Sequence, residues 1–106
     1  MTPIQIMTSG EWSSLICPWC KNDYLHHGEV TVINRIWEDH DGLEIKVNQF
    51  VVESWPVKAD KILMRRNCVK IEFKCEHCPN FSTLVLIQHK GNTFLYWDEN
   101  PEILKG

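Results

Sequence analysis

The stretches of sequence that decide the fold are two short cysteine motifs, Cys17-Pro18-Trp19-Cys20 and Cys75-Glu76-His77-Cys78. A spacer of two residues lets a tight turn direct both sulfur atoms of a pair toward one point. Two such turns, which we call knuckles, supply four thiolates, and a tetrahedral set of four sulfurs is typical of structural zinc. The spacing therefore predicts one structural Zn²⁺ per chain, held by Cys17, Cys20, Cys75 and Cys78.

Two other interpretations of these motifs stay open at the level of sequence. The first motif alone resembles a thioredoxin-type redox dithiol, in which the start of a helix lowers the pKa of one thiol. No strand–motif–helix pattern surrounds it, however, and the second pair competes for its sulfurs. Four cysteines in two pairs also bind iron in rubredoxin-type sites, and composition does not distinguish iron from zinc.

Length and composition indicate one small domain. The chain has 106 residues, of which 43% are hydrophobic, so its core is small and a metal ion would add needed stability. The first residues lack a basic start followed by an apolar run, and no segment approaches the roughly 20 apolar residues of a membrane span. We therefore expect a soluble protein of the cytoplasm.

Alternation of apolar and polar residues, with many β-branched side chains, predicts strands over 30–37, 43–49, 69–74, 81–89 and 93–97. A turn sequence at 39–42 joins the first two of these strands into a hairpin. No segment has the pattern of an amphipathic helix. We expect a mostly β protein, with an antiparallel sheet, a zinc-ribbon-like four-cysteine site and a long insertion between the two knuckles.

The whole chain, 1–106, is predicted to form a single zinc-ribbon-like domain. Residues 1–15 are weakly patterned and read as an N-terminal arm. Residues 53–67 contain Trp55-Pro56 and are predicted to form a long loop. Residues 98–106 are predicted to form an acidic tail.

The charge distribution suggests where a partner could bind. The net charge is −3, yet residues 53–74 carry six basic and three acidic side chains. A tryptophan among basic residues could stack on a base and contact phosphates. The candidate partner-binding residues are Trp55, Lys58, Lys61, Arg65 and Arg66. The negative net charge weakens long-range attraction to a polyanion, and we therefore slightly favour a protein partner over nucleic acid.

Other residues near the motifs have simpler explanations. Cys68 is expected to be a small buried apolar residue and not a ligand. His26 or His27 could donate to a metal-bound sulfur or replace a ligand, or form a polar lead-in to a strand, and His89 could cap the turn that follows it. No Ser–His–Asp or Cys–His grouping is apparent, and a closed four-sulfur shell leaves no open coordination position. We therefore expect no enzymatic activity.

Part of the sequence resembles a pattern found in a known group of proteins. It comprises the stretches Tyr24–His27, Ile71–Cys78 and Gln88–Thr93, together with Trp97. In these stretches the chain resembles small uncharacterised zinc-ribbon-like proteins of phages and integrated mobile elements, from about Cys17 to Trp97. The resemblance implies a bound metal and a phage or mobile-element context, and it implies no reaction. Ribbon knuckles usually have glycine directly after their second cysteine, and Lys21 and Pro79 stand at those positions here.

Taken together, these patterns predict a non-enzymatic, zinc-stabilised module that binds a macromolecule. In the favoured version the module is encoded by a phage or mobile element, is located in the cytoplasm of the host cell, and binds or inhibits a host protein that acts in defence against phages or in transcription. The alternative is a nucleic-acid-binding zinc ribbon that uses the basic segment 55–74. A thiol redox protein is the third and weakest reading.

Overall fold

The computed structural model describes residues 2–35, 40–58, 67–89 and 91–98, with the side chain of His89 excepted. Within these residues the fold consists of strands, with no helix. The strands are β1 (Ile6–Ser9), β2 (Trp12–Leu15), β3 (Leu25–Asn34), β4 (Gly42–Asn48), β5 (Val51–Val57), β6 (Cys68–Cys75), β7 (Phe81–His89) and β8 (Asn92–Asp98). In the described part of the chain, nothing forms a helix long and apolar enough to cross a membrane.

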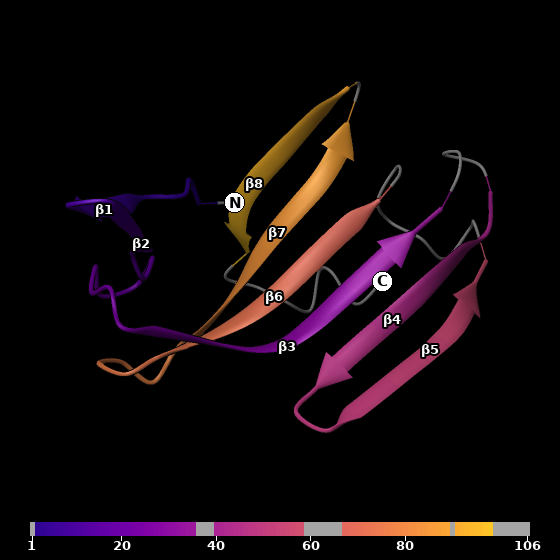
Figure 1. Cartoon of the computed structure of the whole chain (residues 1–106), viewed down its shortest axis with the longest axis horizontal. Helices are drawn as coiled ribbons and strands as arrows, with labels where there is room; N and C mark the ends of the chain where they lie inside the picture. Colours follow the sequence, from indigo (N-terminus) through magenta and orange to yellow (C-terminus); the bar gives the residue numbers. More distant parts are fainter. Residues whose placement is uncertain (1, 36–39, 59–66, 90, 99–106) are drawn as a thin grey trace.

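Six strands form one antiparallel sheet in the order β5-β4-β3-β6-β7-β8 (Figure 1). The predicted mostly β, antiparallel fold is therefore confirmed. The hairpin expected around residues 39–42 is β3–β4, paired from Val30 with Val47 to Asn34 with Leu43. β3 begins at Leu25, earlier than the alternation predicts, because its first residues pair with the end of β6 next to the second cysteine motif.

The predicted N-terminal arm is wrong, because residues 6–15 form a hairpin of their own. β1 and β2 make a separate two-stranded sheet, shown at the left of Figure 1. Gly10 has φ +60°, a left-handed conformation that glycine adopts without steric cost, and it closes the turn between them. The backbone of Thr2 also exchanges hydrogen bonds with that of Trp97, at 2.9 and 2.8 Å, and ties the start of the chain to β8.

The predicted loop over 53–67 is wrong in its first part, because β5 runs to Val57 and pairs with β4 along its whole length. Pro56 is tolerated there because β5 is an edge strand, and its missing N–H removes no bond that the sheet needs. Residues 59–66 of that loop lie outside the described residues. So do residues 99–106 of the predicted acidic tail, whose first residue, Asp98, is the last residue of β8.

One face of the sheet, which we call the apolar face, is built from two rows of directly paired residues. Their side chains share a face because paired residues in antiparallel strands point the same way. The first row is Val52, Val47, Val30, Ile71, Leu84 and Trp97. The second row is Ser54, Ile45, Val32, Val69, Leu86 and Leu95.

The opposite face, which we call the charged face, combines charged residues with the buried core. Its corresponding rows contain Glu44, Lys46, Glu53 and Lys70. The core cluster of Ile33, Cys68 and Val85 also lies on this side, with Val57, Ile87 and Tyr96 packed against it. On the apolar face, burial is complete only toward β7 and β8, where Trp97 packs edge-on against Phe73 with ring centroids 5.5 Å apart.

Candidate metal centre

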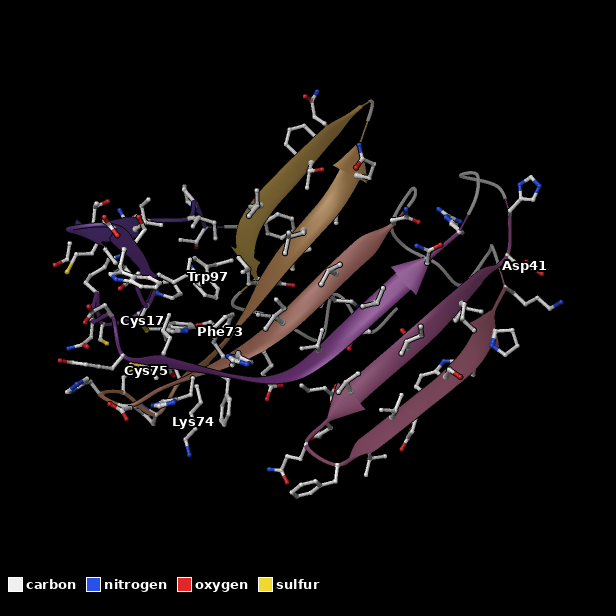
Figure 2. All side chains as sticks on the ribbon, in the orientation of Figure 1. Cys17, Asp41, Phe73, Lys74, Cys75 and Trp97 are labelled. Carbon is white, nitrogen blue, oxygen red and sulfur yellow. The ribbon has the colours of Figure 1, made fainter. Side chains whose placement is uncertain are left out.

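The four cysteines of the two motifs come together at one end of the sheet. Their sulfur atoms all lie within 4.8 Å of one another. Two sulfur–sulfur distances between the knuckles are short. Cys17 Sγ is 3.8 Å from Cys78 Sγ, and Cys20 Sγ is 3.5 Å from Cys75 Sγ. Figure 2 shows Cys17 and Cys75 adjacent at the end of the sheet near β1 and β2. The residues predicted to share a site are therefore brought together.

The spacing of the sulfurs fits a metal centre and not a pair of disulfides. A tetrahedral ion with metal–sulfur bonds of about 2.3 Å separates its sulfurs by about 3.8 Å. The observed separations of 3.5 and 3.8 Å lie close to this value. A disulfide needs about 2.05 Å, and all five cysteines are free. The cluster can hold a single ion, and its four sulfurs suit iron as well as zinc.

The first knuckle is a turn closed by backbone hydrogen bonds. The Lys21 N–H donates to the carbonyl oxygen of Cys17 at 3.0 Å, and the Cys17 N–H donates to that of Asn22 at 2.7 Å. Lys21 has φ 65°, the left-handed conformation for which glycine is the usual residue at this position of a ribbon knuckle. Lys21 thus adopts the backbone conformation that glycine normally provides, and its side chain makes that conformation sterically unfavourable.

The second knuckle follows β6 without a break, and its first sulfur, that of Cys75, has a lowered pKa. The His77 N–H donates to Cys75 Sγ at 3.4 Å. Burial raises the pKa of Cys75, but this hydrogen bond and those with the Cys20 and Cys78 sulfurs outweigh burial and lower it to about 7. Pro79, where ribbons usually have glycine, has its φ held negative by its ring, so the two knuckles differ in how their turns end.

Two sulfurs of the cluster, those of Cys20 and Cys78, have raised pKa values. At Cys20 the hydrogen bond from the Asn22 backbone lowers the pKa, but desolvation and the three neighbouring sulfurs raise it, to about 12. At Cys78 the hydrogen bond from the Asn80 backbone and the Cys20 sulfur lower the pKa, but desolvation and the Cys75 and Cys17 sulfurs outweigh them and raise it. Four thiolates this close together repel one another. A bound dication compensates that repulsion, because a coordinated thiol is deprotonated outright.

Contacts between the two knuckles hold the site in place. The Glu76 N–H donates to the carbonyl oxygen of Tyr24 at 3.0 Å, and Trp19 Nε1 donates to that of Phe81 at 3.3 Å. His26 Nε2 lies 2.7 Å from Glu76 Oε1. The sequence pattern did not single out Tyr24 or Glu76, because their role depends on β3 and β6 being neighbours, which no local motif indicates.

The histidines near the cysteine motifs contact other side chains of the described residues. His26 pairs with a carboxylate, so its nearest partner is Glu76 and not a sulfur. His27 lies edge-on to Phe73, with ring centroids 6.3 Å apart. His77 is exposed, and its ring lies 5.2 Å from that of Tyr24. The role of His89 as a turn cap stays a prediction, because its side chain is outside the described set.

Cys68 is not part of the cluster, as the sequence predicted. It is 1% exposed and belongs to the core of the charged face, at the opposite end of β6 from Cys75. Burial raises the pKa of its thiol to about 11, against a small opposing effect of the Lys70 charge. It therefore remains a neutral thiol at physiological pH, which is the form suited to a packed core.

The candidate partner-binding residues are brought together only in part. Trp55 is half-buried on the charged face, and the Lys46 ammonium lies 5.9 Å from the centre of its ring. Lys58 is exposed and lies 3.5 Å from the carboxylate of Asp41. Lys61, Arg65 and Arg66 lie outside the described residues. The described surroundings of Trp55 and Lys58 therefore contain charges of both signs, with Lys46 and Lys58 basic and Asp41 acidic.

Comparisons of this chain with protein-family models, with curated proteins and with solved structures find no match. The resemblance to zinc-ribbon-like phage proteins therefore stays a prediction. What the chain can do has to be argued from its own geometry, and the four-sulfur cluster is the feature that defines the site.

Proposed function

We propose that this chain is a non-enzymatic, zinc-stabilised module that binds another protein. The observation that carries the proposal is the set of four cysteine sulfurs within 4.8 Å of one another. A shell of four protein thiolates is characteristic of structural zinc and leaves no coordination position for a substrate or an activated water. The ion's role is to join the two knuckles, and with them the ends of β3 and β6.

The described surface supports a protein partner over nucleic acid. Phe50, at the tip of the β4–β5 hairpin, is 98% exposed, and Trp12 on β2 is 79% exposed. Large exposed aromatic side chains of this kind are enriched as anchors in protein interfaces. In contrast, Lys46 lies over the ring of Trp55 and Lys58 is paired with Asp41, an arrangement that does not favour base stacking or phosphate contacts. Following the phage-like resemblance, we favour a host protein as the partner.

The metal is tested by elemental analysis of the purified full chain. We expect one zinc per chain. Absence of metal, or iron in its place, contradicts the zinc assignment. A fold that stays intact after exhaustive chelation contradicts the structural role.

The partner class is tested by comparing nucleic acid and protein binding with the same zinc-loaded preparation. Labelled single- and double-stranded oligonucleotides are titrated at low salt, where phosphate contacts are strongest. We expect no binding tighter than about 10⁻⁴ M, the level of weak non-specific contacts. Tight binding that is abolished by Arg65→Glu with Arg66→Glu, and unchanged by Glu44→Lys, would replace the protein partner with nucleic acid.

A direct search for the partner uses the full chain as bait in an extract of its native host. We expect specific capture of a host protein by the zinc-loaded chain. Phe50→Ala and Trp12→Ala test the two exposed anchors, and loss of capture in either variant identifies the surface that binds. Capture by neither the parent chain nor the variants contradicts the proposal.

A further inference from the structure

The two faces of the six-stranded sheet differ sharply in charge. On the side of the apolar face, the three central alternate positions of each strand carry no Asp, Glu, Lys or Arg. The charged residues of the same strands all fall on the charged face, where Glu44 lies opposite Trp55 and Lys46 opposite Glu53. Figure 2 views the sheet face-on, with carbon-only side chains along its middle strands.

Much of the apolar face is open to solvent. Val52 is 69% exposed, Val47 39% and Leu95 52%, and these residues lie on strands at both sides of the sheet. In the described part of the chain, the strands of this sheet make extensive contacts only with their neighbours in the sheet. A sheet with an apolar side normally buries that side against a second layer of structure. Among the described residues, no such layer covers the face.

The size of the face approaches what a dimer interface needs. Six strands about 4.8 Å apart, with three alternate residues each, cover roughly 400–500 Å² of flat sheet. Leu84 and Trp97 are already buried within the chain, so two copies placed face to face bring together somewhat less than the roughly 900 Å² that the whole face would give. Specific interfaces begin near 1,000 Å² of total buried surface. The area is thus that of a weak, concentration-dependent dimer.

Charge explains why a second copy is the occupant that fits. Each chain has a net charge of −3, so two copies repel wherever their charged surfaces meet. The apolar face carries no charge in its central positions, and a two-fold axis through it brings no like charges together. Homodimer interfaces are more apolar than other protein surfaces and depleted in charge, which matches this face.

We propose that two copies of this chain associate through their apolar faces and form a two-layer β-sandwich. The sheets would pack about 10 Å apart, as aligned sheets do in sandwiches. The charged faces and the hairpin tips with Phe50 then point outward and remain available to other partners. The inference goes beyond the proposed function, since it concerns how the chain assembles and not what it binds.

Two matched pairs of exposed residues test this arrangement. Val51 and Val52 are neighbours on β5, 52% and 69% exposed, and Phe94 and Leu95 are neighbours on β8, 46% and 52% exposed. In each pair the second residue lies on the apolar face and the first on the charged face. Because all four side chains are exposed, a lysine at any of them leaves the fold intact.

The experiment is sedimentation velocity of the zinc-loaded full chain from about 1 µM to 1 mM. We expect a concentration-dependent monomer–dimer equilibrium that Val52→Lys and Leu95→Lys each weaken at least about 10-fold, because each places two uncompensated charges in the interface. Val51→Lys and Phe94→Lys should associate as the parent does. A chain that stays monomeric at every concentration overturns the proposal, and so does a dimer that Val52→Lys and Leu95→Lys leave unchanged. Equal weakening by Val51→Lys and Val52→Lys, with no effect at β8, would place the interface along the β5 edge and also overturn it.

Discussion

Cys68 and Cys75 are the first and last residues of the same strand, β6, and the two ends of that strand give the same side chain opposite chemistry. At one end burial raises the pKa of Cys68 to about 11. At the other end the His77 N–H and two neighbouring sulfurs overcome burial and lower the pKa of Cys75 to about 7. Both side chains are almost fully buried, at 1% and 3% exposed. The comparison teaches that hydrogen-bond donors and neighbouring sulfurs, and not burial, set the Cys75 thiol apart from the Cys68 thiol.

The largest effect is expected from breaking the metal end. Cys75→Ser removes one of the four ligands and leaves an incomplete shell. Zinc binding in such sites contributes on the order of 10 kcal/mol to folding, which is comparable to the roughly 5–15 kcal/mol stability of a whole domain. Its loss is therefore enough to unfold much of the chain. We expect less than one tenth of the parent's zinc content and no cooperative thermal transition, measured by elemental analysis and circular dichroism. Full zinc occupancy in this variant would show that the shell is assigned wrongly.

Breaking the core end should cost far less. Cys68→Ala leaves a small cavity next to Ile33 and Val85, with an expected loss of about 1–2 kcal/mol in the free energy of unfolding. Zinc content should stay at one per chain, because no ligand is removed. Denaturant unfolding of the zinc-loaded variant measures the cost, and elemental analysis provides the control. A variant that loses zinc would place Cys68 in the metal shell.

Alkaline pH should sharpen the same comparison. The folded chain holds the Cys68 proton up to about pH 11, whereas the unfolded chain releases it near pH 9. The unfolded state is therefore favoured as the pH rises through this window, and stability present below pH 9 is lost. We expect parent and Cys68→Ala to converge by up to about 2 kcal/mol between pH 8.5 and 11. Parallel stability curves for the two proteins would contradict the raised pKa.

The smallest effect concerns the strained turn of the first knuckle. Lys21→Gly relieves a left-handed conformation at φ 65° and should stabilise the zinc-loaded chain by up to about 1 kcal/mol. Gln49→Gly is the matched control, because Gln49 has φ 51° in the β4–β5 turn, away from the metal. Both variants should melt slightly higher, but only Lys21→Gly should also slow the release of zinc to a chelator. Identical zinc-release rates in the two variants would show that the strained conformation of Lys21 does not affect how the site holds zinc.

The sequence predicted the elements whose signals are local. The clustering of the four cysteines follows from spacing alone, and β6, β7 and β8 follow from alternation that runs unbroken between turns. β5 was missed because Trp55-Pro56 looks like a break, and only the sheet order shows that Pro56 lies on an edge. The β1–β2 hairpin was missed because strands of four residues carry too few alternations to stand out. The knuckle contacts of Tyr24 and Glu76 depend on β3 pairing with β6, which is a long-range choice that no local pattern encodes.

That β3–β6 pairing also bears on how the chain reaches its fold. Ile33 pairs with Cys68 and Leu25 with Cys75, so two distant segments must find each other in the right register. A slip of one residue would exchange the two faces of either strand. An ion captured early by the two knuckles tethers β3 and β6 at their common end. Residue pairs can then form one after another from that end, without a further large loop to close. Under the proposed metal binding, the ion acts as a template during folding, guiding alignment before the sheet exists, as well as a clamp afterwards.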